Sequence, residues 1–362
     1  MANKPIASDY LQYDAATNTY VMSADQAVRD DVEKHHWINV VRTLIKDWRL
    51  YIMLIPMILI FLFWRYFPLK DLLGSFKDSS KELLEVAQQP FVGFAHFKTL
   101  LFGKDKISLE FWMSFRNTFL TSFYGLCFGF PMPILIALFF NEIKSNVMRS
   151  IYQVLTYLPK FMSTVIITTL LTLLLKPADS VSSAGVVSKL LGVFGVSQTV
   201  VDGGLLNIPN YFRAIYQISG VWETAGYDSI VFFAAIIAVS PTSYEAAQID
   251  GAGKLAQMRY VVLPSILSTV VIMLITRIGS LLNVGYEKVY LLTTSGNREV
   301  AMVVSTFSLE YGGVASGSSS GNNVASLHAL ATAAEMMNNI IGMVLVIGAN
   351  TIAKKVSDVS LY

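Results

Sequence analysis

The stretch EAAQIDGAGKLAQMRYVVLP, residues 245–264, is a polar segment broken by glycine between two apolar runs that are each long enough to cross a bilayer. Just before it, Ser240 is a good N-cap and Pro241 suits the first helical position, so a short helix is expected to begin there. Gly251 and Gly253 allow the left-handed backbone that ends such a helix. A second short helix is expected around residues 254–260, leading to the next apolar run at Pro264. A polar interlude of this kind beside a membrane indicates a docking element.

The stretch resembles the EAA loop of permease subunits in bacterial binding-protein-dependent ABC importers. The family pattern is EAA, three residues, Gly, nine residues and Ile-x-Leu-Pro, and every position matches except Val261, which stands where isoleucine is usual. With six fixed positions at average residue frequencies, a chance match is on the order of 10⁻⁷ per start position. The resemblance implies that residues 240–264 form a coupling helix region that sits in a cleft of an ATP-hydrolysing subunit. The contact residues it implies are Glu245, Ala246, Ala247, Asp250, Gly251, Leu263 and Pro264.

The likeness extends over most of the chain from about Asp47. The stretches DWRLYIMLIP, FPMPILIALFFNEI, YLPKFMSTV, NVGYEKVYLL and the closing SDVSLY are similar to carbohydrate permeases that handle complex oligosaccharides and polysaccharide fragments. This resemblance implies a working unit with a second, similar permease, two ATPase subunits inside the cell and a sugar-binding protein outside. ATP and Mg²⁺ would be held by the ATPases, so no cofactor is expected in this chain.

Composition places the 362 residues in the membrane class, with 54% hydrophobic and 14% charged residues and a net charge of +2. No basic block points to nucleic acid. Cys127 is the single cysteine and lies in an apolar run, so neither a disulfide framework nor a cysteine metal cluster is available. The adjacent His35 and His36 are more simply a solvated pair in a polar tail than metal ligands.

Six apolar runs of bilayer-crossing length predict an all-α polytopic membrane protein, since hydrocarbon leaves the backbone of an open strand unpaired. The runs are residues 50–72, 112–140, 151–175, 211–239, 262–282 and 327–353. We expect a cytoplasmic N-terminal extension at residues 1–46, mobile by composition, and a transmembrane permease domain at residues 47–362. The first 49 residues are polar, so no cleavable signal peptide is expected.

The six spans put both termini on one side, and lysines and arginines flanking the spans favour the cytoplasm, although the segment between the first two spans is also basic. The EAA loop decides the orientation, because its ATPase partner is cytoplasmic. The expected location is a bacterial cytoplasmic membrane. The outer segments are then residues 74–111, 176–210 and 283–326, the last with a low-complexity stretch from Gly312.

Three catalytic or nucleotide patterns fail on their context. GAGKLA at residues 251–256 matches G-x-G-x-x-A, but a helix rather than a strand is expected before it. No Gly-Lys pair is followed by Ser or Thr, so the chain has no Walker A motif and is not expected to be an enzyme. GSSSG at residues 317–321 fits G-x-S-x-G by serine-rich composition alone.

Charged residues inside apolar spans cost about 2.5–3.5 kcal/mol each on insertion scales, so they usually face a bundle interior or a watery cavity. Together with two aromatic neighbours able to stack on sugar rings, they are the candidates for the substrate path: Trp222, Glu223, Tyr227, Asp228, Arg277 and Glu335. Packing or interface anchoring is the competing interpretation.

Two other functions stay open at this point. In an ion-coupled secondary transporter, Glu223, Asp228 or Glu335 would carry the coupling ion at mid-membrane, but the EAA loop would then have no role. A membrane-embedded transferase or hydrolase would need a catalytic cluster, and the sequence offers none.

Overall fold

The computed structural model describes residues 11–14, 19–22, 46–78, 89–177, 185–195, 197–312 and 324–356. It divides into two compact units, Met1–Lys70 and Asp71–Tyr362. The expected domain boundary after residue 46 stays a prediction. In the first unit, β1 (Leu11–Asp14) and β2 (Thr19–Met22) form an antiparallel hairpin in which Leu11 pairs with Met22. Helix α2 (Trp48–Phe61) continues as the π-helical turn η2 (Leu62–Tyr66) and the 3₁₀ segment η3 (Phe67–Phe76), which crosses into the second unit.

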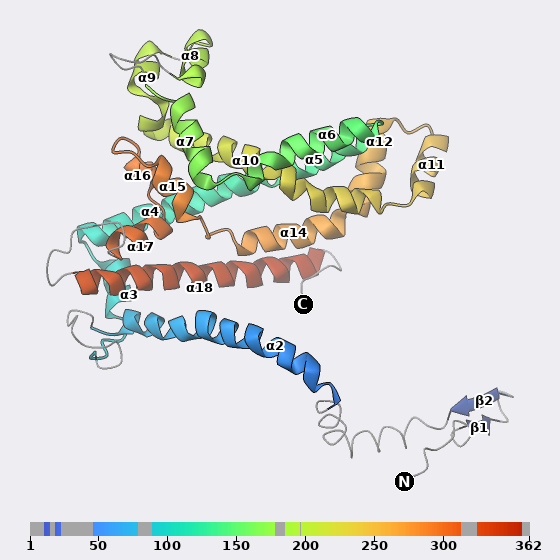
Figure 1. Ribbon diagram of the computed structural model, residues 1–362, viewed down its shortest axis with the longest axis horizontal. Coiled ribbons are helices and arrows are strands. Elements are labelled where there is room, and N and C mark those ends of the chain that lie inside the picture. The colour runs from blue at the N-terminus through green and yellow to red at the C-terminus, as the bar shows by residue number, and fades with distance from the viewer. Residues whose placement is uncertain are drawn as a thin grey trace. The chain divides into compact units, whose positions relative to one another are not determined.

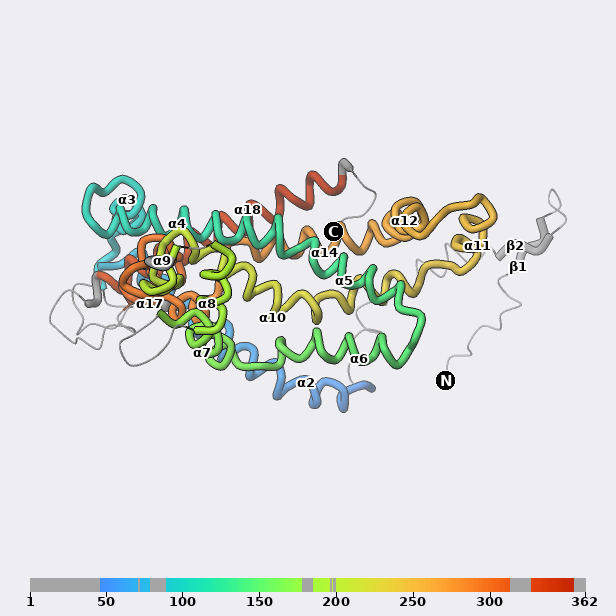
Figure 2. Tube along the Cα trace, turned by 90° about the horizontal axis from the view of Figure 1, so that it is seen from above, coloured from blue at the N-terminus to red at the C-terminus, as the bar shows by residue number. Residues whose placement is uncertain are grey.

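The regular elements of the second unit are all helices over its described residues (Figure 1), apart from an isolated β-bridge between Lys77 and Phe91. Its long helices are α4 (Lys106–Tyr124), α5 (Pro131–Glu142), α6 (Asn146–Tyr157), α10 (Pro209–Ile237), α14 (Leu267–Gly279) and α18 (Val324–Val356). The shorter helices are α3 (Ala95–Phe102), α7 (Thr164–Leu174), α8 (Val186–Val193), α9 (Gln198–Gly203), α11 (Pro241–Ile249), α12 (Lys254–Gln257), α13 (Leu263–Ser265), α15 (Tyr286–Leu292), α16 (Arg298–Ala301) and α17 (Val304–Tyr311). Figure 2 shows α5, α6 and α10 running side by side.

The expected all-α polytopic fold is confirmed, and each of the six apolar runs is helical. Within the described residues, three helices are long and apolar enough to cross a membrane, and there are up to six candidate spans if each sharply bent helix pair counts as one. The low-complexity stretch expected from Gly312 lies, after that residue, outside the described residues up to residue 323.

The third span was expected to be one helix, and this was wrong, because α6 and α7 meet at a bend of 98°. Pro159 supplies no backbone N–H at the junction, which forms the 3₁₀ turn η5 (Leu158–Phe161). Ser163 then begins α7 as an N-cap whose hydroxyl accepts a hydrogen bond from the Val165 N–H at 3.2 Å. The fifth span is also bent, by 64°, just after Pro264.

Helices α4 and α5 form one continuous element of 37 residues despite Pro131 and Pro133. The π-helical turn η4 (Gly125–Gly129) precedes the prolines, which have no backbone N–H to donate. In this turn the Phe130 N–H donates to the Gly125 carbonyl, five residues earlier, at 3.1 Å. Gly125 and Gly129 of this wide turn face α10, where a Cβ on them would meet Gln217 at 3.4 Å and Val221 at 3.9 Å.

Helix α10 passes very close to α6 at Gly226. A Cβ at this position would lie 2.2 Å from the carbonyl oxygen of Thr156, which is backbone and has no flexible end to move. A glycine is therefore required by the distance between the two helices, not by its own backbone angle. The contact holds the bent α6–α7 element against α10.

Gly226→Ala is expected to destabilise the protein by about 1–3 kcal/mol, because the added methyl overpacks the α6–α10 contact. Gly220→Ala, on the same helix, is the matched control, since its Cβ would meet only the Lys288 Nζ at an ordinary 3.9 Å. Thermal unfolding of the purified protein in detergent compares the two. Equal midpoints for both variants would contradict the close approach.

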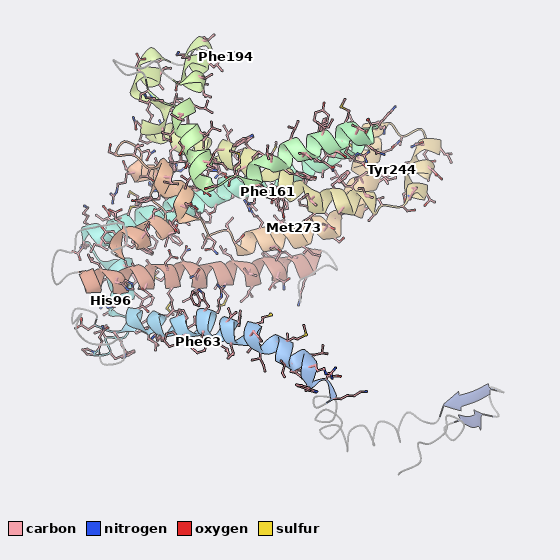
Figure 3. The ribbon with its side chains drawn as sticks, viewed as in Figure 1. Phe63, His96, Phe161, Phe194, Tyr244 and Met273 are labelled. Atoms are coloured by element: carbon pink, nitrogen blue, oxygen red, sulfur yellow. The ribbon has the colours of Figure 1, made fainter. Side chains whose placement is uncertain are left out.

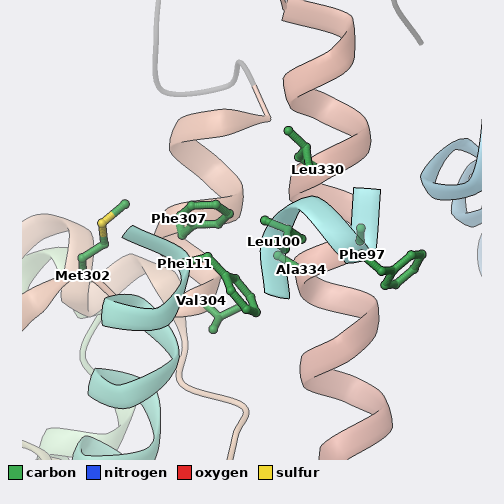
Figure 4. Packing of buried hydrophobic residues seen from close by; sticks show 9 residues of the cluster. Phe97, Leu100, Phe111, Met302, Val304, Phe307, Leu330 and Ala334 are labelled. Atoms are coloured by element: carbon green, nitrogen blue, oxygen red, sulfur yellow. The ribbon is translucent and has the colours of Figure 1, made fainter. Parts of the chain in front are cut away.

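Buried apolar clusters lie at both ends of the second unit. One joins α3, α4, α17 and α18 through Leu100, Phe111, Phe307 and Ala334 (Figure 4). Another joins α5 and α10 to the segment around Val262 through Ala137, Phe232 and Ile236, at the end that carries α11 and α12. A third, on α10, α15 and α16, includes Phe212 and Val289.

Buried amide side chains bind the segment after α14 to the rest of the bundle, although residues 283–326 were expected as an outer segment. Asn117 on α4 donates to the carbonyls of Glu299 and Met302 at 2.8 and 3.0 Å, and accepts from Arg213 at 2.9 Å. Asn297 donates to the carbonyls of Leu206 and Leu292 at 2.8 and 3.0 Å. These bonds satisfy loop carbonyls away from water, so α15, α16 and α17 are integral parts of the bundle.

Candidate functional site

A cavity of about 560 Å³ lies among α10, α14, the η4–α5 turn and the short helix α15. The wide turn contributes Gly125 and Gly129, and the apolar cluster near α11 and α12 contributes Phe130, Phe232 and Met273. Five charged side chains line it: Lys160, Glu223, Asp228, Arg277 and Lys288. Hydroxyl and amide side chains also line the cavity, including Tyr216, Gln217, Thr224, Thr276 and Ser280.

One face of α10 supplies most of the polar lining. Tyr216, Gly220, Glu223 and Thr224 recur at helical spacing, and Asp228 follows one turn later on the same stripe. A smaller polar cavity of about 170 Å³ adjoins this one and shares Gln217, Arg277 and Ser280 with it. The Gln217 amide also donates to the Thr121 carbonyl at 2.6 Å, which ties α10 to α4 beside the wide turn.

An ion pair spans the cavity wall between α10 and α15. Lys288 Nζ lies 2.8 Å from Glu223 Oε2, and the two side chains are only 11% and 16% exposed. Lys288 Nζ also lies 5.4 Å from the centre of the Tyr216 ring. Neither Lys288 nor Lys160 was weighed as a site residue from the sequence. Both stand inside stretches that carried the resemblance, YLPKFMSTV and NVGYEKVYLL, and this was the available signal.

Three of the predicted substrate-path residues come together in this cavity, and three do not. Glu223, Asp228 and Arg277 line it. Helical spacing turns Trp222 away from the stripe of Tyr216 and Glu223, whereas Tyr227 lies near that stripe but does not line the cavity. Trp222 lines a separate apolar cavity against α7 and α8, and the Tyr227 ring meets Phe161 edge to face at 5.9 Å. Glu335 lies on α18, outside the cavity, where its side chain hydrogen-bonds to Ser308. A role in the substrate path stays a prediction for all six residues.

The polar segment at residues 240–264 forms α11, the turn at Gly251 and α12, followed by the π-helical turn η7 (Met258–Val262) and α13. Helix α11 begins at Pro241 as expected, but the Ser240 hydroxyl bonds to the Thr242 hydroxyl at 2.7 Å and not to a backbone N–H. Gly251 has the expected left-handed backbone, with φ of 77°. Gly253 does not: its φ is −69°, because it begins α12 and does not end α11.

The surface of α11 and α12 is open. Glu245, Ala246 and Asp250 are exposed, and Ala247 is half-buried. Neither Glu245 nor Asp250 forms a side-chain hydrogen bond or ion pair with any residue that the structure describes. Ile249 and Leu255 are 86% and 81% exposed, so apolar and acidic groups share this surface. Leu263 and Pro264, also exposed, lie past α12 at the start of α13.

Two contacts fix the loop to the bundle. Lys254 Nζ of α12 lies 3.0 Å from Glu142 Oε2, at the end of α5. Tyr244 of α11, labelled in Figure 3 together with Met273 of α14, packs with Met273 against the cluster around Phe232. The loop thus continues directly from α10 and is bonded to α5, and both of these helices line the cavity.

The chain matches known proteins over most of its length. Residues 129–353 match the model of the family described as binding-protein-dependent transport system inner membrane component. Protein LplB and the polygalacturonan/rhamnogalacturonan transport system permease protein YteP, both of Bacillus subtilis, are each 34% identical and are matched over 92% of their length and 88% of this chain.

Among solved structures, a chain of a bacterial ABC transporter involved in import of the acidic polysaccharide alginate superposes with a TM-score of 0.73 at 34% identity. The match covers 88% of this chain and 99% of that chain. A chain of a bacterial alginate ABC transporter in complex with an alginate pentasaccharide-bound periplasmic protein superposes equally well, with a TM-score of 0.73 at 34% identity. The resemblance to permeases of binding-protein-dependent ABC importers is thereby confirmed, and this chain belongs to the family of binding-protein-dependent transport system inner membrane components.

Proposed function

We propose that this chain is the membrane-spanning subunit of an ATP-driven oligosaccharide importer in a bacterial cytoplasmic membrane. The cavity around Glu223, Asp228 and Arg277 would be its half of the translocation path, and α11 and α12 would be its contact with an ATPase. One observation carries the proposal: the exposed, unpaired loop surface and the polar cavity wall are joined by a single helix, α10.

The connection is short enough to transmit motion. Asp228 is nine positions before Ile237, the last residue of α10, which is about 14 Å at the helical rise of 1.5 Å per residue. Helix α11 begins four positions after Ile237, at Pro241. The Lys254–Glu142 pair gives a second connection, from α12 to α5. A displacement of the loop would therefore move α10 and α5 together, and both helices line the cavity.

The partners follow from the loop and from the relatives. An exposed helix pair that carries Glu245, Asp250 and Ile249 needs a protein surface to cover it, and an ATPase subunit is the partner implied by the EAA pattern. The complete transporter would contain a second, similar permease, two ATPases and an outer sugar-binding protein, as the alginate-binding periplasmic protein suggests by analogy. Both termini of this chain would lie in the cytoplasm, on the side of the loop.

The mechanism needs two global states that different ligands favour. Closure of the ATPases on ATP would displace α11 and α12 and tilt α10 and α5, so that the cavity opens outward and accepts the sugar from the binding protein. Hydrolysis would return the cavity to its inward state. This chain would contribute binding groups and one coupling contact, without covalent chemistry.

The test is uptake by proteoliposomes that contain the assembled transporter. Labelled fragments of polygalacturonan and of alginate serve as probes, because relatives carry these names. We expect uptake to require Mg²⁺-ATP on the side of the loop and the binding protein on the opposite side. Ionophores should leave this uptake unchanged. Uptake that persists without nucleotide and stops with an ionophore would show an ion-coupled transporter instead.

A further inference from the structure

The charges of the cavity do not balance among themselves. Three cations, Lys160, Arg277 and Lys288, face two carboxylates, Glu223 and Asp228. Lys288 and Glu223 satisfy each other at 2.8 Å, with little exposure of either. The remaining cavity therefore holds Lys160 and Arg277 against Asp228 alone, an excess of one positive charge.

The two remaining cations are available for binding. Arg277 and Lys160 are both exposed, and within the described part of the chain neither side chain forms an ion pair or donates a hydrogen bond. The Asp228 carboxylate interacts electrostatically with both cations, more strongly with Arg277 than with Lys160. Its side-chain hydrogen bond is with Thr224. Charged groups inside membrane spans usually pair with one another or line a substrate pathway. Arg277 has only the shared charge of Asp228 opposite it, so its guanidinium N–H groups are available to an anionic ligand.

We infer that this cavity has a subsite for the carboxylate of a uronate-containing oligosaccharide, held between Arg277 and Lys160. The guanidinium fork matches a carboxylate in a bidentate geometry, and the lysine adds a point charge from the η5 turn. One carboxylate balances the single excess charge, whereas a phosphate group of nearly two charges would exceed it. Gln217, Thr276 and Ser280 line the same cavity and offer polar groups to the sugar hydroxyls. This inference rests on the proposed function and names the substrate class of the same site.

Asp228 sets the strength of the subsite. Its carboxylate is the internal counter-charge of Arg277 and Lys160 when no substrate is bound, and it repels an incoming uronate. A transport site must release its substrate. The Asp228 carboxylate competes with the uronate carboxylate for the two cations, and this competition would keep binding weak enough for release. Removal of the negative charge of Asp228 should therefore strengthen binding of acidic sugars, and removal of the positive charge of Arg277 should weaken it.

The experiment measures direct binding, by calorimetry, to the assembled transporter in nanodiscs without its sugar-binding protein. The probes are the trisaccharides of galacturonate and of mannuronate, each compared with its fully methyl-esterified form, which has the same shape without the charge. We expect the wild type to bind at least one acid about tenfold more tightly than its ester. Arg277→Gln should remove this preference and leave ester binding unchanged, Lys160→Gln should reduce it, and Asp228→Asn should increase acid affinity.

Lys104→Gln is the matched control, because it removes one exposed lysine charge outside the cavity and should leave the preference as in the wild type. The subsite is overturned if the wild type binds neither acid better than its ester, or if Arg277→Gln weakens acid and ester equally. If the transporter imports acids and esters equally well with ATP, the subsite is contradicted but the proposed function is not. If it imports no tested saccharide with ATP, the proposed function itself is contradicted.

Discussion

Valine in place of Gly251 should separate ATP hydrolysis from sugar uptake while the transporter still assembles. Gly251 has a φ of 77°, and the turn around it is a Schellman cap: the Gly251 N–H donates to the Gln248 carbonyl at 3.0 Å and the Ala252 N–H to the Ala247 carbonyl at 2.8 Å. A β-branched residue pays about 2 kcal/mol in this backbone region. That penalty is about a 30-fold shift in the equilibrium away from the native turn.

The consequence would be confined to the angle between α11 and α12. No atom lies within 4 Å of a Cβ built at Gly251, so the substitution meets no steric obstacle and leaves the bundle untouched. In the proposed mechanism this angle decides whether α11 still engages the ATPase while Lys254 keeps α12 on α5. We expect uptake to fall about tenfold or more, with ATP hydrolysis retained or freed from its dependence on substrate.

Gly253→Val supplies the control, since its Cβ would also meet open space but its φ is −69°, which valine adopts without strain. Uptake and ATP hydrolysis are measured in the same proteoliposomes for both variants. If Gly251→Val imports sugar as fast as Gly253→Val, then the turn does not hold the loop in a coupling position.

Run lengths and fixed spacings were sufficient to predict the helical class, the six apolar runs and the position of the exposed loop. The bend of 98° after α6 was not predicted, although Pro159 stands in the sequence, because a proline in a membrane helix is as compatible with a straight span as with a break. Which outcome occurs depends on the neighbours, here on α10 and the contact at Gly226.

The site shows the same limit. The cavity groups on α10 were recognisable as charged residues in an apolar span, and so was Arg277. Their partners were not, because Lys288 lies 65 positions after Glu223 and in a segment expected to be outside the membrane. Helical spacing separates Trp222 from the cavity residues of α10, but it does not separate Tyr227, whose ring contacts Phe161 instead. Contacts between distant segments decide both points.

Loss of the Lys288 charge should cost the protein much of its stability, through Glu223. In Lys288→Met the side chain keeps its length, but a carboxylate that is 16% exposed loses its partner at 2.8 Å. Breaking one side of a buried ion pair typically costs 3–5 kcal/mol, and we expect about 3 kcal/mol here because the pair borders a cavity. The thermal midpoint of the purified protein should fall on the order of 5 °C.

The double variant Glu223→Gln/Lys288→Met decides whether charge pairing is the cause. It removes both charges and keeps both shapes, so most of the lost stability should return, and the double-mutant cycle should give a coupling free energy of about 2 kcal/mol or more. Single variants as stable as the wild type would mean that cavity water screens both groups. In that case Lys288 and Glu223 would both be free, and the net charge of the cavity would stay at +1. Arg277 and Lys160 would then no longer be its only free cations, and the assignment of a single uronate carboxylate to them would lose its basis. The stability of this pair therefore bears directly on what the cavity is built to bind.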